Sequence, residues 1–427
     1  MVAAQIHRQK LSGGHRLGLL TGGEALFAAL VQAMDAARSS IHLETYIFDF
    51  QGSPLVVAQA LERAALRGLT VRLVVDGVGT ADMPAAWRAR LLAAGVQLRV
   101  YAPLGRLGLL LPSRWRRLHR KLCVVDGVLG FCGGINLLDD HIDTATNALY
   151  FPRFDFALRC TGPLVGDMNA SMLQLWWRLQ AVRKARQREF GAAWEALKAG
   201  APVGDFSDWL LPDWPWEHGR RLHERSTPRT PPPLVDNAQA MLVLRDNIWH
   251  RADIEKAYLK AIGEARHEVL LANAYFVPGR RLRRALVTAA ARGVRVRVLM
   301  QGHYEGFMQY HAARPVYKQL IDAGVDVREY TPSAMHAKVA VVDGTWATVG
   351  SSNLDPLSLL LAREANVITT DSRFAHDLRQ RLQQAMDHGA SALDHQALTA
   401  RPWHQRALDR LAFGLMRTLL FLTGHRY

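Results

Sequence analysis

The stretches HRKLCVVDG (119–127) and HAKVAVVDG (336–344) decide the fold, because they carry one pattern twice in a chain of 427 residues. Three further blocks repeat around them in the same order: IHLETYIFD (41–49) with VLLANAYFV (269–277), RGLTVRLVVDG (67–77) with RGVRVRVLMQG (292–302), and AGVQLRVY (94–101) with AGVDVREY (323–330). Matched blocks in one order indicate an internal duplication. We therefore expect the chain to build one structural unit twice.

Each half alternates short β-branched runs with stretches of helical periodicity. Residues 25–39 and 253–267 carry apolar residues at intervals of three and four, as amphipathic helices do. The runs VRLVV and VRVRVLM are apolar enough to form strands buried on both faces. The pattern predicts an α/β fold of two duplicated α/β/α halves with mixed sheets.

The halves are separated by a region of different composition. It holds six of the eleven tryptophans and many basic residues, and it ends in STPRTPPPL, which is typical of a stiff linker. The chain is therefore predicted to consist of a first half, a Trp- and Pro-rich insertion, a second half and a C-terminal amphipathic helix, over residues 1–165, 166–237, 238–400 and 401–427.

The composition favours a globular protein with a polyanionic partner. Lys and Arg total 53 against 38 Asp and Glu, a net charge of +15, which suits either nucleic acid or an anionic membrane. The three cysteines, Cys123, Cys132 and Cys160, lack C-x-x-C spacing and are predicted to be buried free thiols. The start MVAAQIHRQK does not resemble a signal peptide, and no run approaches the ~18 apolar residues of a spanning helix. We expect a cytoplasmic protein that contacts a membrane from outside.

The repeated pattern has the form H-x-K-x-x-x-x-D. Residues two apart on a strand point to the same face, so each His and Lys should project together, and each Asp-Gly that follows signals a hairpin turn. An Asn lies 17 positions after each His, where the returning strand ends. One copy thus supplies an imidazole, an ammonium and an amide for a phosphate. The two sets are His119, Lys121, Asp126 and Asn136, and His336, Lys338, Asp343 and Asn353.

A catalytic histidine needs a partner that fixes its tautomer. Asp155 lies 36 residues after His119, and Glu364 lies 28 residues after His336, both within strand-like segments. We expect Asp155 to orient His119 and Glu364 to orient His336; the alternative is that each is an ordinary exposed carboxylate. No metal site is predicted, because no carboxylate lies at ligand spacing and the neighbouring Lys repels a cation.

The doubled motif, together with GSSNLDPLS (350–358) and IHLETYIFDFQG (41–52), resembles the phospholipase D superfamily. The match is closest to bacterial cardiolipin synthases, particularly the type without N-terminal transmembrane helices, and covers roughly residues 15–160 and 240–370. After GSSNLDPLS those enzymes often carry a polar Asn-rich stretch, whereas this chain reads LLLAREAN. That difference concerns recognition of the acceptor more than the chemistry.

The resemblance implies one active site at the interface of the two halves, without a cofactor. One histidine attacks phosphorus to give a phosphohistidine, and the other protonates the leaving alcohol. By position His119 matches the nucleophile and His336 the acid, while the lysines and asparagines match the groups that bind the phosphate. The aspartates Asp126 and Asp343 belong to the catalytic motif by name, but we interpret them as structural supports near the turn.

The resemblance also implies a substrate: two phosphatidylglycerol molecules give cardiolipin and glycerol. The predicted partner is an anionic phospholipid membrane, at the cytoplasmic face of the bacterial inner membrane, with peripheral attachment and no nucleic acid. Residues 104–118, the tryptophans from 176 onward and a C-terminal leucine stripe are candidate membrane contacts. The leucines are equally explained by packing on the domain; they are Leu408, Leu411, Leu415, Leu419 and Leu422.

Other functions remain open at this point. A hydrolytic phospholipase D, a phosphatidylserine synthase or a nuclease uses the same motif, and a basic surface also suits DNA. A non-catalytic membrane scaffold is less favoured because both motifs are intact. The oligomeric state cannot be predicted.

Overall fold

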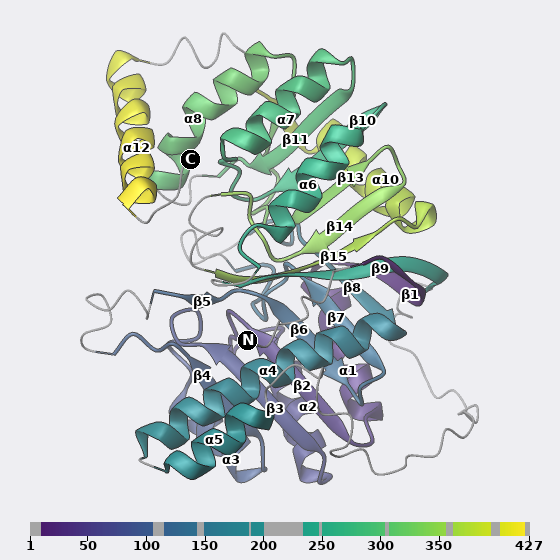
Figure 1. Ribbon diagram of the computed structural model, residues 1–427, viewed down its shortest axis with the longest axis vertical. Coiled ribbons are helices and arrows are strands. Elements are labelled where there is room, and N and C mark those ends of the chain that lie inside the picture. Colours follow the sequence, from purple (N-terminus) through teal and green to yellow (C-terminus); the bar gives the residue numbers. More distant parts are fainter. Residues whose placement is uncertain are drawn as a thin grey trace, which may run out of the picture.

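The computed structural model describes residues 10–105, 115–142, 149–187, 189–199, 234–246, 250–303, 307–355, 362–393 and 402–422. Their strands form a single sheet of 16 strands, with a lobe on either side of the β1–β9 pair (Figure 1). The strand order is β16-β12-β11-β10-β13-β14-β15-β9-β1-β8-β7-β6-β2-β3-β4, and β5 pairs with β15 outside this path.

The first lobe contains these elements: β1 (Ser12–Thr21), α1 (Gly22–Ala36), β2 (Ser40–Thr45), α2 (Leu55–Leu66), β3 (Thr70–Asp76), α3 (Ala85–Ala93), β4 (Gln97–Tyr101), β5 (Arg117–Leu118), β6 (Lys121–Val125), β7 (Leu129–Gly133), β8 (Phe156–Thr161), α4 (Pro163–Arg186) and α5 (Phe190–Ala199).

The second lobe repeats the order: β9 (Val235–Arg245), α6 (Asp253–Glu264), β10 (Glu268–Asn273), α7 (Arg280–Ala291), β11 (Arg295–Gln301), α8 (Phe307–Asp322), β12 (Asp326–Tyr330), β13 (Lys338–Val342), β14 (Trp346–Gly350), β15 (Ala362–Thr369), α10 (Ser372–His388), β16 (Ala390–Ala392) and α12 (Trp403–Leu422).

The predicted mixed sheets and duplication are confirmed. In the first lobe β2, β3 and β4 run parallel while β6, β7 and β8 are antiparallel neighbours, and β10 to β15 repeat this arrangement in the second. The two sheets are joined edge to edge, because β1 and β9 pair antiparallel. The halves therefore share one continuous sheet, which the repeats alone do not reveal.

The predicted hairpin turns follow each H-x-K segment. Asp126 and Gly127 have φ values of 52° and 68°, and Asp343 and Gly344 have 50° and 64°. Positive φ at both central residues is the requirement of type I′ hairpin turns, which suits Asp-Gly. Each turn returns the chain as the next antiparallel strand, β7 or β14.

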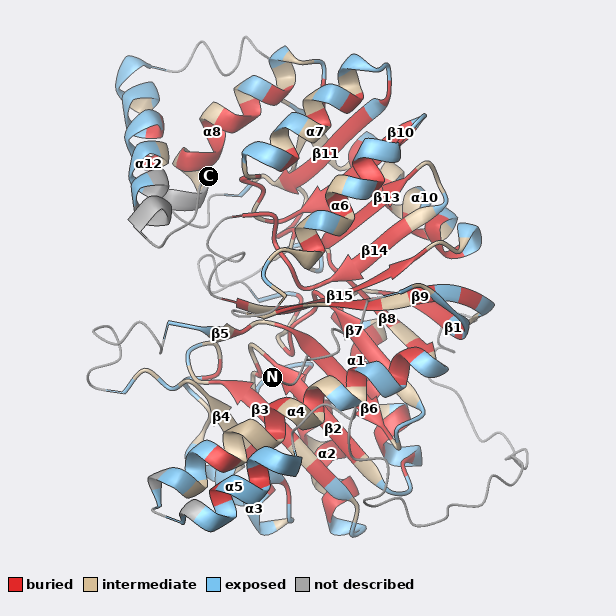
Figure 2. Cartoon of the chain, viewed as in Figure 1, coloured by how far each residue is buried: buried red, intermediate tan, exposed pale blue. Residues whose placement is uncertain are grey.

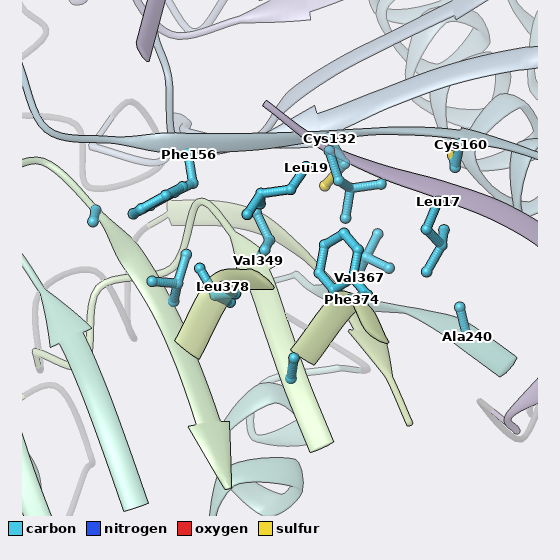
Figure 3. Close-up of a cluster of buried hydrophobic side chains, with 14 of the residues drawn as sticks. Leu17, Leu19, Cys132, Phe156, Cys160, Ala240, Val349, Val367, Phe374 and Leu378 are labelled. Atoms are coloured by element: carbon cyan, nitrogen blue, oxygen red, sulfur yellow. The ribbon is translucent and has the colours of Figure 1, made fainter. Parts of the chain in front are cut away.

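The lobes also share one apolar cluster. Leu17 and Leu19 from β1 belong to the same buried group as Val349, Val367 and Phe374 from the second lobe. Figure 3 shows these side chains together between β1 and helix α10. Burial therefore fixes the lobes relative to each other, and the active site can be divided between them. The three cysteines are free and buried, as predicted.

The helix α4 and the strand-covering helices complete an α/β/α arrangement. The shared cluster contains residues of α4 and α10 on one face of the sheet, and the other clusters contain α1 and α2 in one lobe and α6, α7 and α8 in the other. The strands in the interior of each lobe are buried, parts of β1 and β9 are exposed, and the helices expose their outer sides (Figure 2). The division of the chain into four segments stays a prediction, but α4 packs on the first lobe as α10 packs on the second, although it lies largely in the predicted insertion.

Candidate active site

The first motif lies against the second lobe. Strand β5, immediately before His119, pairs in parallel with β15, and the His119 and Arg120 amides donate to the Arg363 carbonyl at 3.0 and 2.8 Å. His119 then leads into β6, which belongs to the first lobe. The histidine is thus held where the two lobes meet.

The second motif mirrors this contact. The His336 amide donates to the Phe154 carbonyl at 2.9 Å, and the Phe154 amide donates to the Ala334 carbonyl at 2.9 Å. A parallel bridge joins Phe154 and Met335. Each motif therefore contacts the other lobe at the beginning of a strand, at the second residue of β15 or just before β8.

These contacts reverse the predicted histidine–carboxylate pairs. His119 Nδ1 lies 2.9 Å from the Glu364 carboxylate, and His336 Nδ1 lies 2.7 Å from that of Asp155. The prediction that Asp155 orients His119 and Glu364 orients His336 was wrong. The reason lies in the backbone: each acid directly follows the residue whose carbonyl holds the opposite histidine. Both imidazoles are 15% exposed, while the carboxylates of Glu364 and Asp155 are 0% and 2% exposed, so solvent reaches only the rings.

Each lysine side chain folds back onto the backbone of the histidine two residues before it. Lys121 Nζ donates to the His119 carbonyl at 2.7 Å, and Lys338 Nζ donates to the His336 carbonyl. Burial, opposed by Glu364 and reinforced by the nearby Lys338 ammonium, lowers the pKa of Lys121 to about 7. Two buried lysine side chains on either side of one site favour an anion between them, and a phosphodiester supplies one.

The acid–base groups have strongly perturbed proton affinities. Burial raises the pKa of Asp155 to about 7, against the opposing effect of Lys338. Burial also lowers the pKa of His119, and it lowers that of His336 well below its ordinary value, with both lysines contributing. Such shifts in a partly open site are typical of acid–base catalysis.

Both asparagines are buried. Asn136 Oδ1 accepts from the Ile47 amide at 3.3 Å. Asn353 is 2% exposed, and its Oδ1 has no hydrogen-bond partner among the described residues. A buried amide oxygen without a partner is costly, so a bound ligand that donates to it offsets that cost.

Comparison with known proteins identifies the family. The model of the "Cardiolipin synthase, PLD-like domain" family matches residues 30–151 and 258–386. Cardiolipin synthase B of Escherichia coli is 37% identical over 413 residues, 96% of this chain and 90% of that protein. The chain belongs to the cardiolipin synthase family. As a member, it is a phosphatidyltransferase of the phospholipase D superfamily, as the two motifs predict.

More distant relatives agree with the fold. A cardiolipin synthase of Geobacillus kaustophilus is 28% identical over 415 residues, 96% of this chain and 74% of that protein. Among solved structures, phosphatidylserine synthase of Haemophilus influenzae superposes with a TM-score of 0.65 at 13% identity and covers 97% of both chains. That likeness concerns the fold alone.

The structure adds two residues to the site that the sequence analysis did not predict, Tyr46 and Ser351. The Tyr46 ring lies 5.0 Å from the His119 ring, and Lys121 Nζ lies 5.5 Å from the same tyrosine ring. The hydroxyl of Ser351 donates to the Glu364 carboxylate at 2.5 Å. The sequence contained a signal for Tyr46. In the aligned repeats 41–49 and 269–277, Tyr46 stands opposite Ala274, so the two copies differ at this position.

Asp155 and Glu364 have different neighbours at the matching position of the two copies, Gly134 and Ser351. A Cβ on Gly134 would lie 2.4 Å from Asp155 Oδ1, so only glycine allows that acid to approach. The corresponding position of the second copy is Ser351, whose hydroxyl binds Glu364 instead. The two histidines therefore sit beside chemically distinct acids, which gives the duplicated site two unequal halves.

The motif aspartates lie away from this chemistry. Asp126 accepts from the amides of Arg38, Ser39 and Ser40 at 2.8 to 2.9 Å. Asp343 does the same for the amides of residues 266–268, again at 2.8 to 2.9 Å. Each carboxylate ties the hairpin turn to the start of a neighbouring strand, which agrees with the interpretation of structural support rather than with a catalytic role.

The candidate membrane contacts are only partly described. Trp176 is buried and stacks beneath Arg99, with 4.7 Å between the guanidinium and the ring, so this tryptophan serves the core. Trp194 is 60% exposed. Residues 106–114 and 200–233 lie outside the described residues, and so do the side chains of Leu419 and Leu422.

The C-terminal helix α12 leaves Leu411 and Leu415 on the surface. It packs on α8 through Ala412 and through the pair of Asp409 with His311, whose atoms are 2.6 Å apart. Leu411 and Leu415 are 67% and 52% exposed. In the described part of the chain, no helix combines the length and apolar character needed to cross a bilayer. The described residues also contain no group of three or more His, Cys, Asp or Glu placed to hold a metal ion.

Proposed function

We propose that this protein joins two phosphatidylglycerol molecules to give cardiolipin and glycerol. The observation that carries the proposal is the pair of crossed histidine–carboxylate contacts, with a lysine beside each histidine, in a member of the cardiolipin synthase family. A site divided between two lobes presents two imidazoles to one phosphodiester. Exchange of one alcohol for another needs this arrangement, because one group must attack while the other handles the proton.

The attacking group is His119. A carboxylate accepts a proton, so Glu364 keeps the proton of His119 on Nδ1 and leaves the lone pair of Nε2 for phosphorus. Nε2 forms a bond to phosphorus as the bond to the glycerol oxygen breaks. Lys121, Lys338 and the two asparagines, Asn136 and Asn353, hold the phosphate oxygens.

The leaving glycerol takes its proton from His336. The Asp155–His336 pair shares a proton near neutral pH, since burial raises the pKa of Asp155 to about 7. That proton reaches the departing oxygen through His336 Nε2. In the second step the hydroxyl of another phosphatidylglycerol returns a proton to His336 and attacks phosphorus. The bond to His119 breaks, and cardiolipin leaves.

The substrate is a bilayer lipid, so attachment to a membrane is part of the proposal. The exposed leucines of α12 and the net charge of +15 suit peripheral binding to an anionic surface, at the cytoplasmic face of the inner membrane. No nucleic acid partner is proposed.

The test is incubation of the purified protein with phosphatidylglycerol vesicles, with EDTA present and no nucleotide. We expect cardiolipin and glycerol in equal amounts, and mass spectrometry of the trapped intermediate should find the phosphatidyl group on His119. A requirement for CDP-diacylglycerol, or cleavage of DNA without lipid turnover, would contradict the proposal. A phosphatidyl group on His336 would reverse the roles of the histidines.

A further inference from the structure

A basic groove lies between α7, α8 and α12, and none of the catalytic side chains lines it. Its volume is about 410 Å³. Three cations and one carboxylate line it together with an apolar wall: Arg280, Arg283, Lys318, Asp322, Pro315 and Phe413. Lys318 and Asp322 contact each other at 2.7 Å, so the one carboxylate of this lining is already engaged.

Helix α7 concentrates the positive charge. Its sequence RRLRRALVTAAA has four arginines in the first five residues and no acid. Arg280 and Arg283 are one helical turn apart and both line the groove, whereas Arg281 and Arg284 do not. The Arg280 side chain makes no hydrogen bond or ion pair with another described residue. The partial positive charge of the helix N-terminus adds to the attraction for an anion.

The position of the groove connects it with the lipid chemistry. Asn273 at the end of β10 pairs with Lys338, and only residues 274–279 separate it from the start of α7. The two groove arginines of α7 therefore lie a short connection away from the strand end that pairs with Lys338 of the active site. The other wall of the groove, Phe413, lies on the helix whose Leu411 and Leu415 are exposed. Cationic and apolar surfaces are adjacent here.

We propose that this groove binds the phosphate of an anionic glycerophospholipid while the lipid stays in the bilayer, as a second lipid site outside the catalytic centre. Arg280 and Arg283 form the guanidinium pair that suits a phosphate, and Phe413 contacts the start of the acyl chains. Basic pockets beside membrane-contacting helices recognise anionic headgroups in this way. The inference rests on the proposed function only in placing the protein on a phospholipid bilayer.

The test compares two doubly substituted full chains, both in a His119→Asn background so that no lipid is consumed. One carries Arg280→Gln and Arg283→Gln; the matched control carries Arg281→Gln and Arg284→Gln and loses the same charge from the same helix. On vesicles of phosphatidylcholine with phosphatidylglycerol, we expect the groove pair to lose about tenfold more affinity than the control. Equal losses would overturn the proposal, because they would indicate general surface attraction.

Calorimetry distinguishes a lipid headgroup from free phosphate. With dihexanoyl-phosphatidylglycerol below its micelle concentration, the control should bind one more lipid molecule than the groove pair. Inorganic phosphate that binds the groove as tightly as the lipid would contradict the lipid assignment. Because the readout is binding to an inactive chain, it is independent of whether the enzyme makes cardiolipin.

Discussion

The crossed pairs predict that each carboxylate controls the histidine of the opposite lobe. The perturbation is Glu364→Gln, which removes the negative charge of the carboxylate whose Oε2 lies 3.1 Å from His119 Nδ1 while keeping the shape of the side chain. The carboxylate is fully buried, so removing its charge weakens a charge-assisted hydrogen bond, a loss of up to about 1.5–3 kcal/mol. Phosphorylation of His119 should therefore slow by up to about 10- to 150-fold. The comparison variant is Asp155→Asn, which alters only the partner of His336.

The assay is the burst of nitrophenol from a nitrophenyl phosphodiester in a single turnover. Nitrophenol leaves without protonation, so the burst reports attack by His119 and does not need His336. Glu364→Gln should slow the burst, and Asp155→Asn should leave it close to wild type while still slowing turnover of phosphatidylglycerol. The reasoning is refuted if Asp155→Asn slows the burst and Glu364→Gln spares it, since that pattern belongs to uncrossed pairs.

Three other changes test the remaining assignments. Turnover of phosphatidylglycerol should decline as the pH rises through about 7, because the Asp155–His336 pair then loses the proton that glycerol needs; a kcat profile that rises over that range would contradict this. Replacing Leu411 and Leu415 with Gln should weaken vesicle binding at least about tenfold with little change in Tm, since both are exposed, and Leu→Met at the same positions is the control. Asp126→Ala should lower the free energy of unfolding by about 2 kcal/mol, measured by urea titration, because three backbone amides lose their acceptor; loss of activity at unchanged stability would indicate a catalytic role instead.

Most of the fold could be predicted from the sequence because the duplication is visible in short stretches of neighbouring residues. Apolar runs, Asp-Gly turns and the order of the repeats each depend on neighbours along the chain, so the hairpins after His119 and His336 and the mixed sheets were confirmed. Buried thiols were also predictable, since the cysteines lie in apolar runs.

The crossing of the acids could not be predicted from spacing. Distances along the chain place Asp155 and Glu364 in their own halves, but they carry no information on which lobe faces which histidine. That information resides in the β5–β15 pairing and in the contact of Phe154 with His336, which form only when the lobes meet.

Helix α4 was misleading for a similar reason. Its tryptophans were interpreted as candidate membrane contacts, yet Trp176 is buried and Arg72 and Arg99 stack on it, at 5.4 and 4.7 Å from the ring. Arginine covers an aromatic ring as readily as it faces water, so composition alone does not separate the two.

The pairing of β1 with β9 has a consequence for the history of the chain. An ancestral single copy that placed β1 against the same strand of a second molecule would already have completed two histidine–carboxylate pairs, each drawn from both molecules. Fusion would then have freed the two copies to differ, as Gly134 beside Asp155 and Ser351 beside Glu364 now do. Neither copy can change independently, however, because each acid contacts the histidine of the other copy, so a substitution near either acid alters that histidine.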